Sequence, residues 1–224
     1  MPPTLTRAEL AAYIDHTILK PEATAAQVEV LCAEAREHGF AAVCVNPSRV
    51  ALAAKVLAGS VVQVCTVAGF PLGATLPEAK ATETQAAISA GATEVDMVLN
   101  VGVLKDGDHA RVQADVAAVV EAAKGGASVK VILENCLLSP EAITQACLLC
   151  KEAGADYVKT STGFGSSGAK VEDVKRMRAA VGLELGVKAA GGIRDTDTAL
   201  AMIDAGATRI GASASIAILD GLGA

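Results

Sequence analysis

The chain has 224 residues, of which 52% are hydrophobic, and a formal net charge of −6. Surfaces that bind nucleic acid depend on clustered excess Lys and Arg, so this acidic balance argues against a nucleic-acid partner. The length is somewhat below the roughly 250 residues typical of a (β/α)8 barrel and too great for most two-layer domains. We therefore expect one domain over residues 1–224.

The first residues, Met1-Pro2-Pro3-Thr4, lack the basic and apolar regions of a signal peptide, and no stretch approaches 18 uninterrupted apolar residues. This predicts a cytoplasmic protein that does not interact with membranes. The six cysteines lack the density of a disulfide scaffold, which favours reduced thiols. Cys147 and Cys150 have the spacing of a CxxC motif, but they fall in a predicted helix without further ligands, so core packing is favoured over a metal or redox site.

Eight apolar segments are predicted strands: Tyr13–Leu19, Ala42–Asn46, Val61–Val67, Glu94–Val101, Val129–Glu134, Tyr157–Ser161, Gly186–Ala190 and Arg209–Gly211. Helical patterns alternate with them, for example at Ala25–His38, Pro77–Ala90, Ala110–Ala123, Pro140–Ala153, Glu172–Ala180 and Thr196–Ala205. Short connections and almost continuously apolar strands indicate a parallel sheet covered by helices. An open doubly wound sheet is the alternative, but eight units and no G-x-G-x-x-G after the first strand favour a closed (β/α)8 TIM barrel.

Charged residues interrupt the predicted strands. Lys130, Lys159 and Lys188 lie in three of them, and Asp15 and Asp96 in two others. An ammonium facing the covering helices would be buried among aliphatic groups at a high cost, so the barrel interior near its C-terminal mouth is the expected location. A structural ion pair is the ordinary explanation for one such lysine, but several together favour chemistry.

Two lysines close together repel each other as ammonium ions, which lowers the pKa of at least one and provides a free amine. An amine beside a carboxylate and a second cation can form an imine and move protons. The loops after the later predicted strands are small and hydroxylated: Thr160-Ser161-Thr162-Gly163, Ala190-Gly191-Gly192 and Gly211-Ala212-Ser213. Such loops often bind phosphate in barrels, and Ser213 is predicted to open a short final helix.

Six segments resemble the deoxyribose-phosphate aldolase family in order along nearly the whole chain: Tyr13-Ile14-Asp15-His16-Thr17, Val43-Cys44-Val45-Asn46-Pro47, Phe70-Pro71-Leu72-Gly73, Glu94-Val95-Asp96-Met97-Val98, Val158-Lys159-Thr160-Ser161-Thr162-Gly163 and Val187-Lys188-Ala189-Ala190-Gly191-Gly192. The resemblance implies reversible cleavage of 2-deoxy-D-ribose 5-phosphate to acetaldehyde and D-glyceraldehyde 3-phosphate. The implied route is that of a class I aldolase, without a metal or other cofactor.

The resemblance also implies residue roles. Lys159 would form the Schiff base, Lys188 would depress the pKa of Lys159 and help move protons, and Asp96 would act with a water as general acid and base. The implied substrate-binding residues are Asp15, Thr160, Gly163, Gly191, Gly192, Gly211 and Ser213. Relatives of this kind also suggest a homo-oligomer, a dimer or tetramer, with small-molecule phosphosugar and aldehyde substrates.

Two departures from some members of the family are visible. Phe164 follows the K-T-S-T-G motif where some members have Lys, and Ala214 follows Ser213 where some have a second Ser, which predicts weaker phosphate binding. The chain ends at Gly221-Leu222-Gly223-Ala224 without the C-terminal Tyr that some members use in proton transfer. A water held by Asp96 is expected to do that work alone.

Three other functions stay open on the sequence. A transaldolase-like or keto-acid aldolase would share the imine. A phosphosugar isomerase would need a base at a strand end, and Glu134 could supply it. A barrel that only binds a ligand would keep expensive polar strand residues without using them.

Overall fold

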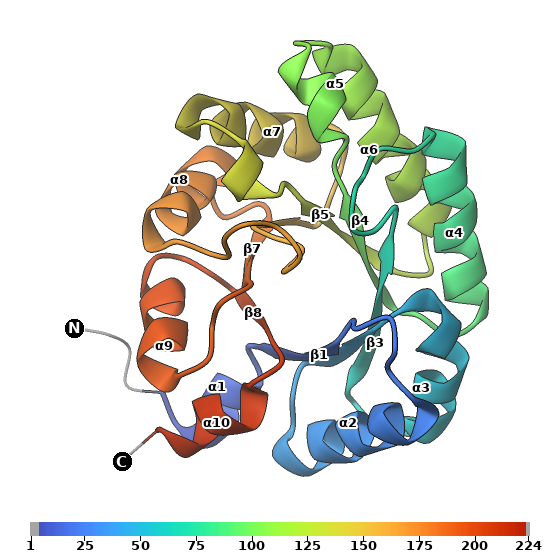
Figure 1. Cartoon of the computed structure of the whole chain (residues 1–224), viewed down its shortest axis with the longest axis vertical. Coiled ribbons are helices and arrows are strands. Elements are labelled where there is room, and N and C mark those ends of the chain that lie inside the picture. Colours follow the sequence, from blue (N-terminus) through green and yellow to red (C-terminus); the bar gives the residue numbers. More distant parts are fainter. Residues whose placement is uncertain (1–4, 223–224) are drawn as a thin grey trace.

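Strands and helices alternate along the whole of the computed structural model, which describes residues 5–222 (Figure 1). The strands are β1 (Ile14–Ile18), β2 (Ala42–Val45), β3 (Gln63–Ala68), β4 (Glu94–Val98), β5 (Ser128–Ile132), β6 (Tyr157–Lys159), β7 (Gly186–Ala190) and β8 (Arg209–Ala212). The helices are α1 (Arg7–Ala11), α2 (Ala25–His38), α3 (Val50–Val56), α4 (Pro77–Ser89), α5 (Val101–Lys105), α6 (His109–Ala123), α7 (Pro140–Glu152), α8 (Val171–Val181), α9 (Thr196–Asp204) and α10 (Ser215–Asp220), with 3-10 turns at Pro47–Arg49 and Asn135–Leu137.

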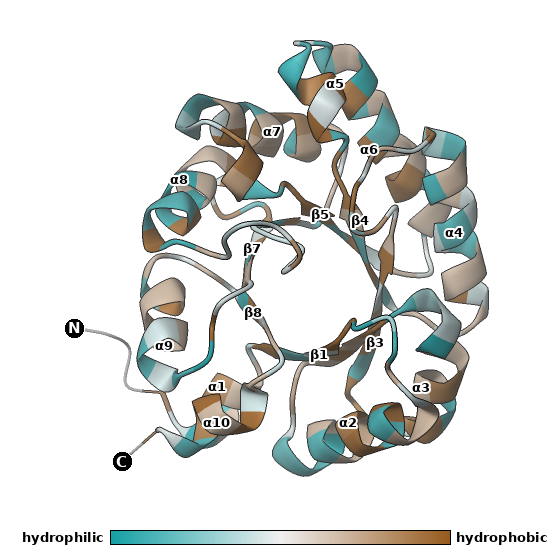
Figure 2. Ribbon diagram, in the orientation of Figure 1, coloured by the Kyte–Doolittle hydropathy of each residue, from teal (hydrophilic) through white to brown (hydrophobic). Residues whose placement is uncertain are grey.

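The strands pair in parallel in the order β1 to β8, and β8 pairs with β1 to close the barrel. The predicted (β/α)8 barrel is therefore confirmed. Side chains of a barrel strand point alternately inward and outward, and the outward aliphatic residues form one large core beneath the helices. Figure 2 shows this arrangement as hydrophobic colour along the strands and hydrophilic stretches on the surrounding helices. The prediction for the C-terminal tail at Gly223 and Ala224 lies outside the described residues.

The chain departs from the predicted elements where a side chain ends a strand early. The strand expected to reach Val101 ends at Val98, because the Asn100 side chain accepts a hydrogen bond from the amide of Val103 and caps α5. The five-residue helices α1 and α5 and the seven-residue α3 are too short for a clear helical period, so the residue pattern did not predict them.

The final helix also begins later than predicted. Ser213 does not open it, because α10 starts at Ser215 and Ala214 occupies the N-cap position without a side-chain cap. The buried Ser215 hydroxyl donates to the carbonyl of Ala212 at 3.1 Å, which holds the preceding turn in place of a cap. Within residues 5–222, none of the helices combines the length and the apolar character needed to cross a membrane.

A buried ion pair joins two helices outside the barrel. Lys80 on α4 donates to Asp115 on α6 at 2.6 Å and to the carbonyl of Val98 at the end of β4 at 2.9 Å. Burial lowers the pKa of Lys80 and raises that of Asp115, and the pairing opposes both changes. The contact holds the C-terminal end of β4 against these helices.

We predict that Lys80→Met lowers the free energy of unfolding by about 3–5 kcal/mol, because it leaves the buried Asp115 without its partner. The double variant Lys80→Met/Asp115→Leu should recover most of this loss in urea denaturation. Lys124→Met is the control, since the Lys124 ion pair with Glu121 is exposed and contributes about 1 kcal/mol or less. If the double variant instead loses as much free energy of unfolding as the two single substitutions added together, the pairing would be contradicted.

Candidate active site

Three neighbouring strands place lysines inside the barrel. Lys130 is on β5, Lys159 ends β6 and Lys188 lies on β7, where Lys159 and Lys188 are register partners. All three are buried, and their ammonium groups meet carboxylates of β1 and β4 rather than the helices. The interior location predicted for these lysines is what the structure shows. Buried ammonium ions need such partners, since their transfer from water is costly.

Asp96 on β4 connects the three lysines. Its Oδ2 accepts hydrogen bonds from Lys159 and Lys188, each at 2.7 Å, and its Oδ1 accepts from Lys130 at 3.0 Å. Burial by itself would raise the pKa of Asp96, but the charges of the lysines outweigh it and hold the pKa well below its ordinary range. Asp96 is therefore a carboxylate at neutral pH.

Asp15 forms a second centre beside this carboxylate. It accepts hydrogen bonds from Lys188 at 2.5 Å through Oδ2 and from Arg209 at 2.6 Å through Oδ1. Burial would raise the pKa of Asp15, but Lys188, Lys130 and Arg209 lower it to about 2. Asp15 therefore orders the lysine network.

Sequence reasoning missed two members of the network. Glu94 accepts from Lys130 at 2.5 Å and from Arg209 at 3.2 Å. Glu94 begins β4 and Arg209 begins β8, and a charge at the start of a strand is commonly solvent-exposed. Their residue types alone therefore did not indicate that they belong to the buried network. Strand alternation was the available signal, because Glu94 lies two residues before Asp96 and so shares its inward face.

Lys188 and Lys159 differ in their surroundings. Lys188 contacts both Asp15 and Asp96, and these charges overcome its burial and raise its pKa, so Lys188 stays an ammonium. Lys159 pairs with Asp96 only, among the carboxylates of residues 5–222, and it stands at the C-terminal end of its strand. Lys159 is also the least buried of the three lysines, with 3% of its surface exposed against 1% for Lys188 and 0% for Lys130.

The predicted phosphate-binding glycines lie in loops at this mouth. Gly163, Gly191 and Gly192 have positive φ angles of 87°, 84° and 78°, which residues with a side chain rarely adopt. The amide of Ala169 donates to the carbonyl of Gly191 at 3.0 Å and so ties the loop after β6 to the loop after β7. Backbone amides in such loops are suited to anions.

Three other predicted substrate-binding residues have visible local contacts. The Thr160 hydroxyl donates to the carbonyl of Ala190 at 3.0 Å and accepts from its amide at 3.1 Å. A Cβ at Gly211 would lie 3.0 Å from the Lys188 side chain, so this glycine makes room for that lysine. Ser213 is exposed beside a cavity of about 510 Å³ that Lys20 also lines.

Glu134 and Phe164 border a second cavity of about 420 Å³ at the mouth. The Glu134 carboxylate accepts from the Thr162 hydroxyl and from the Thr162 amide at 3.4 Å, and it holds the loop after β6. These contacts occupy the group that a phosphosugar isomerase would use as a base. Phe164 packs edge-on against Phe70, with ring centroids 5.3 Å apart.

The remaining candidates have structural contacts. His16 bonds to Ser215 at 2.9 Å and to Glu34 at 2.7 Å on the helix side of β1. Cys147 and Cys150 are buried in α7. All six cysteines lie within the described residues and are free thiols.

A closed parallel barrel with an interior lysine at a strand end and a shared carboxylate is an arrangement suited to a barrel lyase that uses a lysine. Comparison with known proteins narrows this class. A family model described as DeoC/LacD family aldolase matches residues 10–221. The chain belongs to this family and is an aldolase.

Named relatives cover almost the whole chain. A protein of Exiguobacterium sibiricum named deoxyribose-phosphate aldolase is 63% identical over 95% of this chain and 96% of its own length. One of Clostridium perfringens with the same name is 59% identical over 97% of each chain. A solved structure described as a tetrameric deoxyribose phosphate aldolase from Aeropyrum pernix has a TM-score of 0.90 at 36% identity, over 96% of this chain and 91% of the other. The resemblance found in the motifs is confirmed.

We predict that Asp15 gives a pH-dependent part of the stability. Because its pKa is lowered from 3.8 to about 2, its contribution is complete above about pH 4 and is lost as the pH falls toward 2. The difference in unfolding free energy between the parent and Asp15→Asn should therefore shrink by about 2 kcal/mol from about pH 5 to about pH 2. Urea denaturation at several pH values measures it, and a constant difference would contradict the assigned role.

Proposed function

We propose that the protein cleaves 2-deoxy-D-ribose 5-phosphate reversibly to acetaldehyde and D-glyceraldehyde 3-phosphate through a Schiff base on Lys159. The observation that carries the proposal is the position of Lys159, at the end of β6 with its Nζ 2.7 Å from the Asp96 carboxylate. The names of the relatives at 59–63% identity support this substrate. A transaldolase-like aldolase would share the imine but not these motifs.

The amine of Lys159 attacks the aldehyde carbon C1 of the open-chain sugar, and loss of water leaves a protonated imine. The C3 hydroxyl then gives up its proton, the C2–C3 bond breaks, and its electron pair forms the enamine C1=C2. D-Glyceraldehyde 3-phosphate leaves with C3 as its aldehyde carbon. Protonation of C2 and addition of water then release acetaldehyde and return the free amine, so the lysine is a covalent catalyst.

Asp96 is suited to move these protons together with a water, because it stays ionised and contacts the nucleophile directly. Lys188 stays a cation 2.7 Å from the same carboxylate oxygen. Lys188 holds Asp96 in place and can exchange a proton with Lys159 through the shared carboxylate. The expectation that Lys188 also acts on the ionisation of Lys159 stays a prediction.

Gly191, Gly192 and Ser213 are proposed to bind the phosphate, with Gly163 on the facing loop. The left-handed glycines and the tie between the two loops support this assignment. Phe164 brings an aromatic ring rather than a cation to the loop after β6. We expect phosphate binding to depend mainly on backbone amides, which carry no net charge. Substrate contacts of Thr160 and Gly211 belong to the same proposal.

We further propose that the protein works in the cytoplasm as a homo-oligomer without a nucleic-acid partner. The net charge of −6 supports the last point, and the tetramer described for the Aeropyrum pernix relative supports the oligomer.

We predict that the purified protein releases acetaldehyde and D-glyceraldehyde 3-phosphate from deoxyribose 5-phosphate in a coupled assay. Lys159→Leu should abolish this activity, because no other described lysine occupies the same position. Asp96→Asn should lower kcat by about 10²–10⁴-fold, because a proton-transfer group is lost.

The matched control is Lys175→Leu, which removes an exposed lysine of α8 and should leave kcat unchanged. A folded parent that does not cleave the sugar, or a folded Lys159→Leu variant with full activity, would overturn the proposal.

A further inference from the structure

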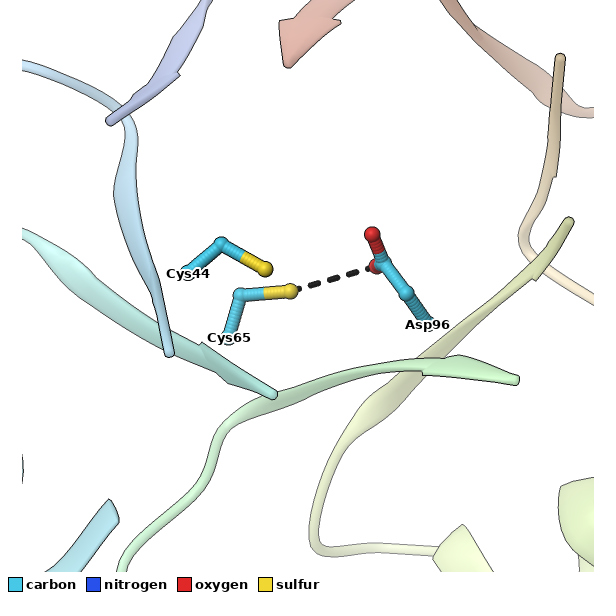
Figure 3. A group of neighbouring side chains, drawn as sticks. All are labelled: Cys44, Cys65 and Asp96. Atoms are coloured by element: carbon cyan, nitrogen blue, oxygen red, sulfur yellow. Dashed lines mark hydrogen bonds between the residues drawn. The ribbon is translucent and has the colours of Figure 1, made fainter. Parts of the chain in front are cut away.

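Two thiols face Asp96 inside the barrel. Cys44 on β2 and Cys65 on β3 are register partners on neighbouring strands, and Asp96 is on the next strand, β4. All three side chains are buried. Figure 3 shows the two sulfur atoms and the carboxylate turned toward one another, with Cys65 bonded to Asp96. The proposed reaction uses neither thiol.

The spacing of these groups suits one metal ion. The two Sγ atoms and a carboxylate oxygen all lie within 4.8 Å of one another, and Cys65 Sγ donates to Asp96 Oδ1 at 3.2 Å. Zinc binds thiolate at roughly 2.3 Å and carboxylate oxygen at roughly 2.0–2.2 Å with tetrahedral geometry, so two ligand atoms on one ion lie about 3.5–3.8 Å apart. Shifts of up to about 1 Å would therefore bring all three groups onto one ion.

We propose that Cys44, Cys65 and Asp96 form an inhibitory binding site for zinc and for the chemically similar cadmium ion. Two sulfur ligands select such borderline and soft cations over magnesium or calcium, which prefer oxygen. The ion is an inhibitor here and has no part in the proposed reaction. Only the inhibition depends on the proposed function, since binding is a property of the three side chains alone.

Charge balance allows a cation among the lysines. Binding of one M²⁺ ion breaks the S–H bonds of Cys44 and Cys65 and forms two metal–thiolate bonds and a bond to the Asp96 carboxylate, with release of two protons. The net charge of the barrel interior is the same before and after. Lys130 Nζ lies 3.5 Å from Cys65 Sγ, so it already contacts sulfur and would face a thiolate after binding.

A neighbouring group of ligands is less suitable. Asp15, Cys65 and Glu94 also lie within 4.8 Å of one another. Arg209 bonds to both of these carboxylates and Lys188 to Asp15, so an ion there would have to displace fixed cations. At Asp96 the ion replaces the Cys65 proton on Oδ1, where Lys130 is the one cation that has to move aside, and it leaves Oδ2 bonded to Lys159 and Lys188.

The site inhibits because it shares Asp96. A carboxylate bound to a metal ion is a poor base, so Asp96 can no longer exchange protons with Lys159 and the substrate. Inhibition should therefore be reversed when a chelator removes the ion.

We predict that the reduced full-length protein binds one cadmium ion per chain, with the ultraviolet charge-transfer absorption of cadmium–thiolate bonds and release of two protons. Cys44→Ser and Cys65→Ser should each weaken binding by at least about tenfold, which corresponds to 1.4 kcal/mol. Cys136→Ser is the matched control, because Cys136 is the most accessible cysteine and lies outside the cluster. If Cys65→Ser does not fold, Cys44→Ala provides the same test.

The binding site would be overturned by the absence of this absorption in the reduced parent, by its persistence in Cys44→Ser, or by its loss in Cys136→Ser. In the activity arm, stoichiometric zinc should lower the retro-aldol rate at least about tenfold, with recovery on chelation and resistance in Cys44→Ser. Cadmium binding without any effect of zinc on the rate would overturn the inhibition. A parent without aldolase activity would instead contradict the proposed function, because the absorption is measured without substrate.

Discussion

The shared carboxylate of Asp96 is the interaction on which the site depends. Three buried lysines donate to its two oxygens, at distances from 2.7 to 3.0 Å. Each ammonium would be costly to bury alone, and their mutual repulsion would add to that cost. One carboxylate between them, supported by Asp15 and Glu94, makes the cluster stable enough to exist in the barrel.

The register of the strands gives the lysines different surroundings. Lys188 lies between Asp15 and Asp96 and is fixed as a cation, whereas Asp96 is the one carboxylate among the described residues that pairs with Lys159. Gly211 on β8 leaves the space through which the Lys188 side chain passes. The network therefore gives the two lysines different partners, which suits the different roles proposed for them.

Much of this could be predicted from the sequence. Eight apolar strands that alternate with helical patterns indicated the barrel. Lys159, Lys188 and Asp96 were conspicuous because each places a charge in an otherwise apolar strand. Glu94 and Arg209 were missed because they begin their strands, where charge is ordinary. Asn100 ended β4 early through a side-chain cap, and the last helix began at Ser215, two details that depend on single hydrogen bonds rather than on periodicity. That Cys44 and Cys65 lie side by side could not be predicted from the sequence, because it depends on the register between β2 and β3.

The most direct test of the account is chemical trapping of the imine. The protein is reduced with sodium borohydride in the presence of excess deoxyribose 5-phosphate, digested, and analysed by peptide mass spectrometry beside Lys159→Leu and Lys188→Leu. The account predicts a substrate-derived adduct on Lys159 in the parent and none in Lys159→Leu. An adduct on Lys130 or Lys188 in the parent, or no adduct on any lysine of the folded protein, would contradict it.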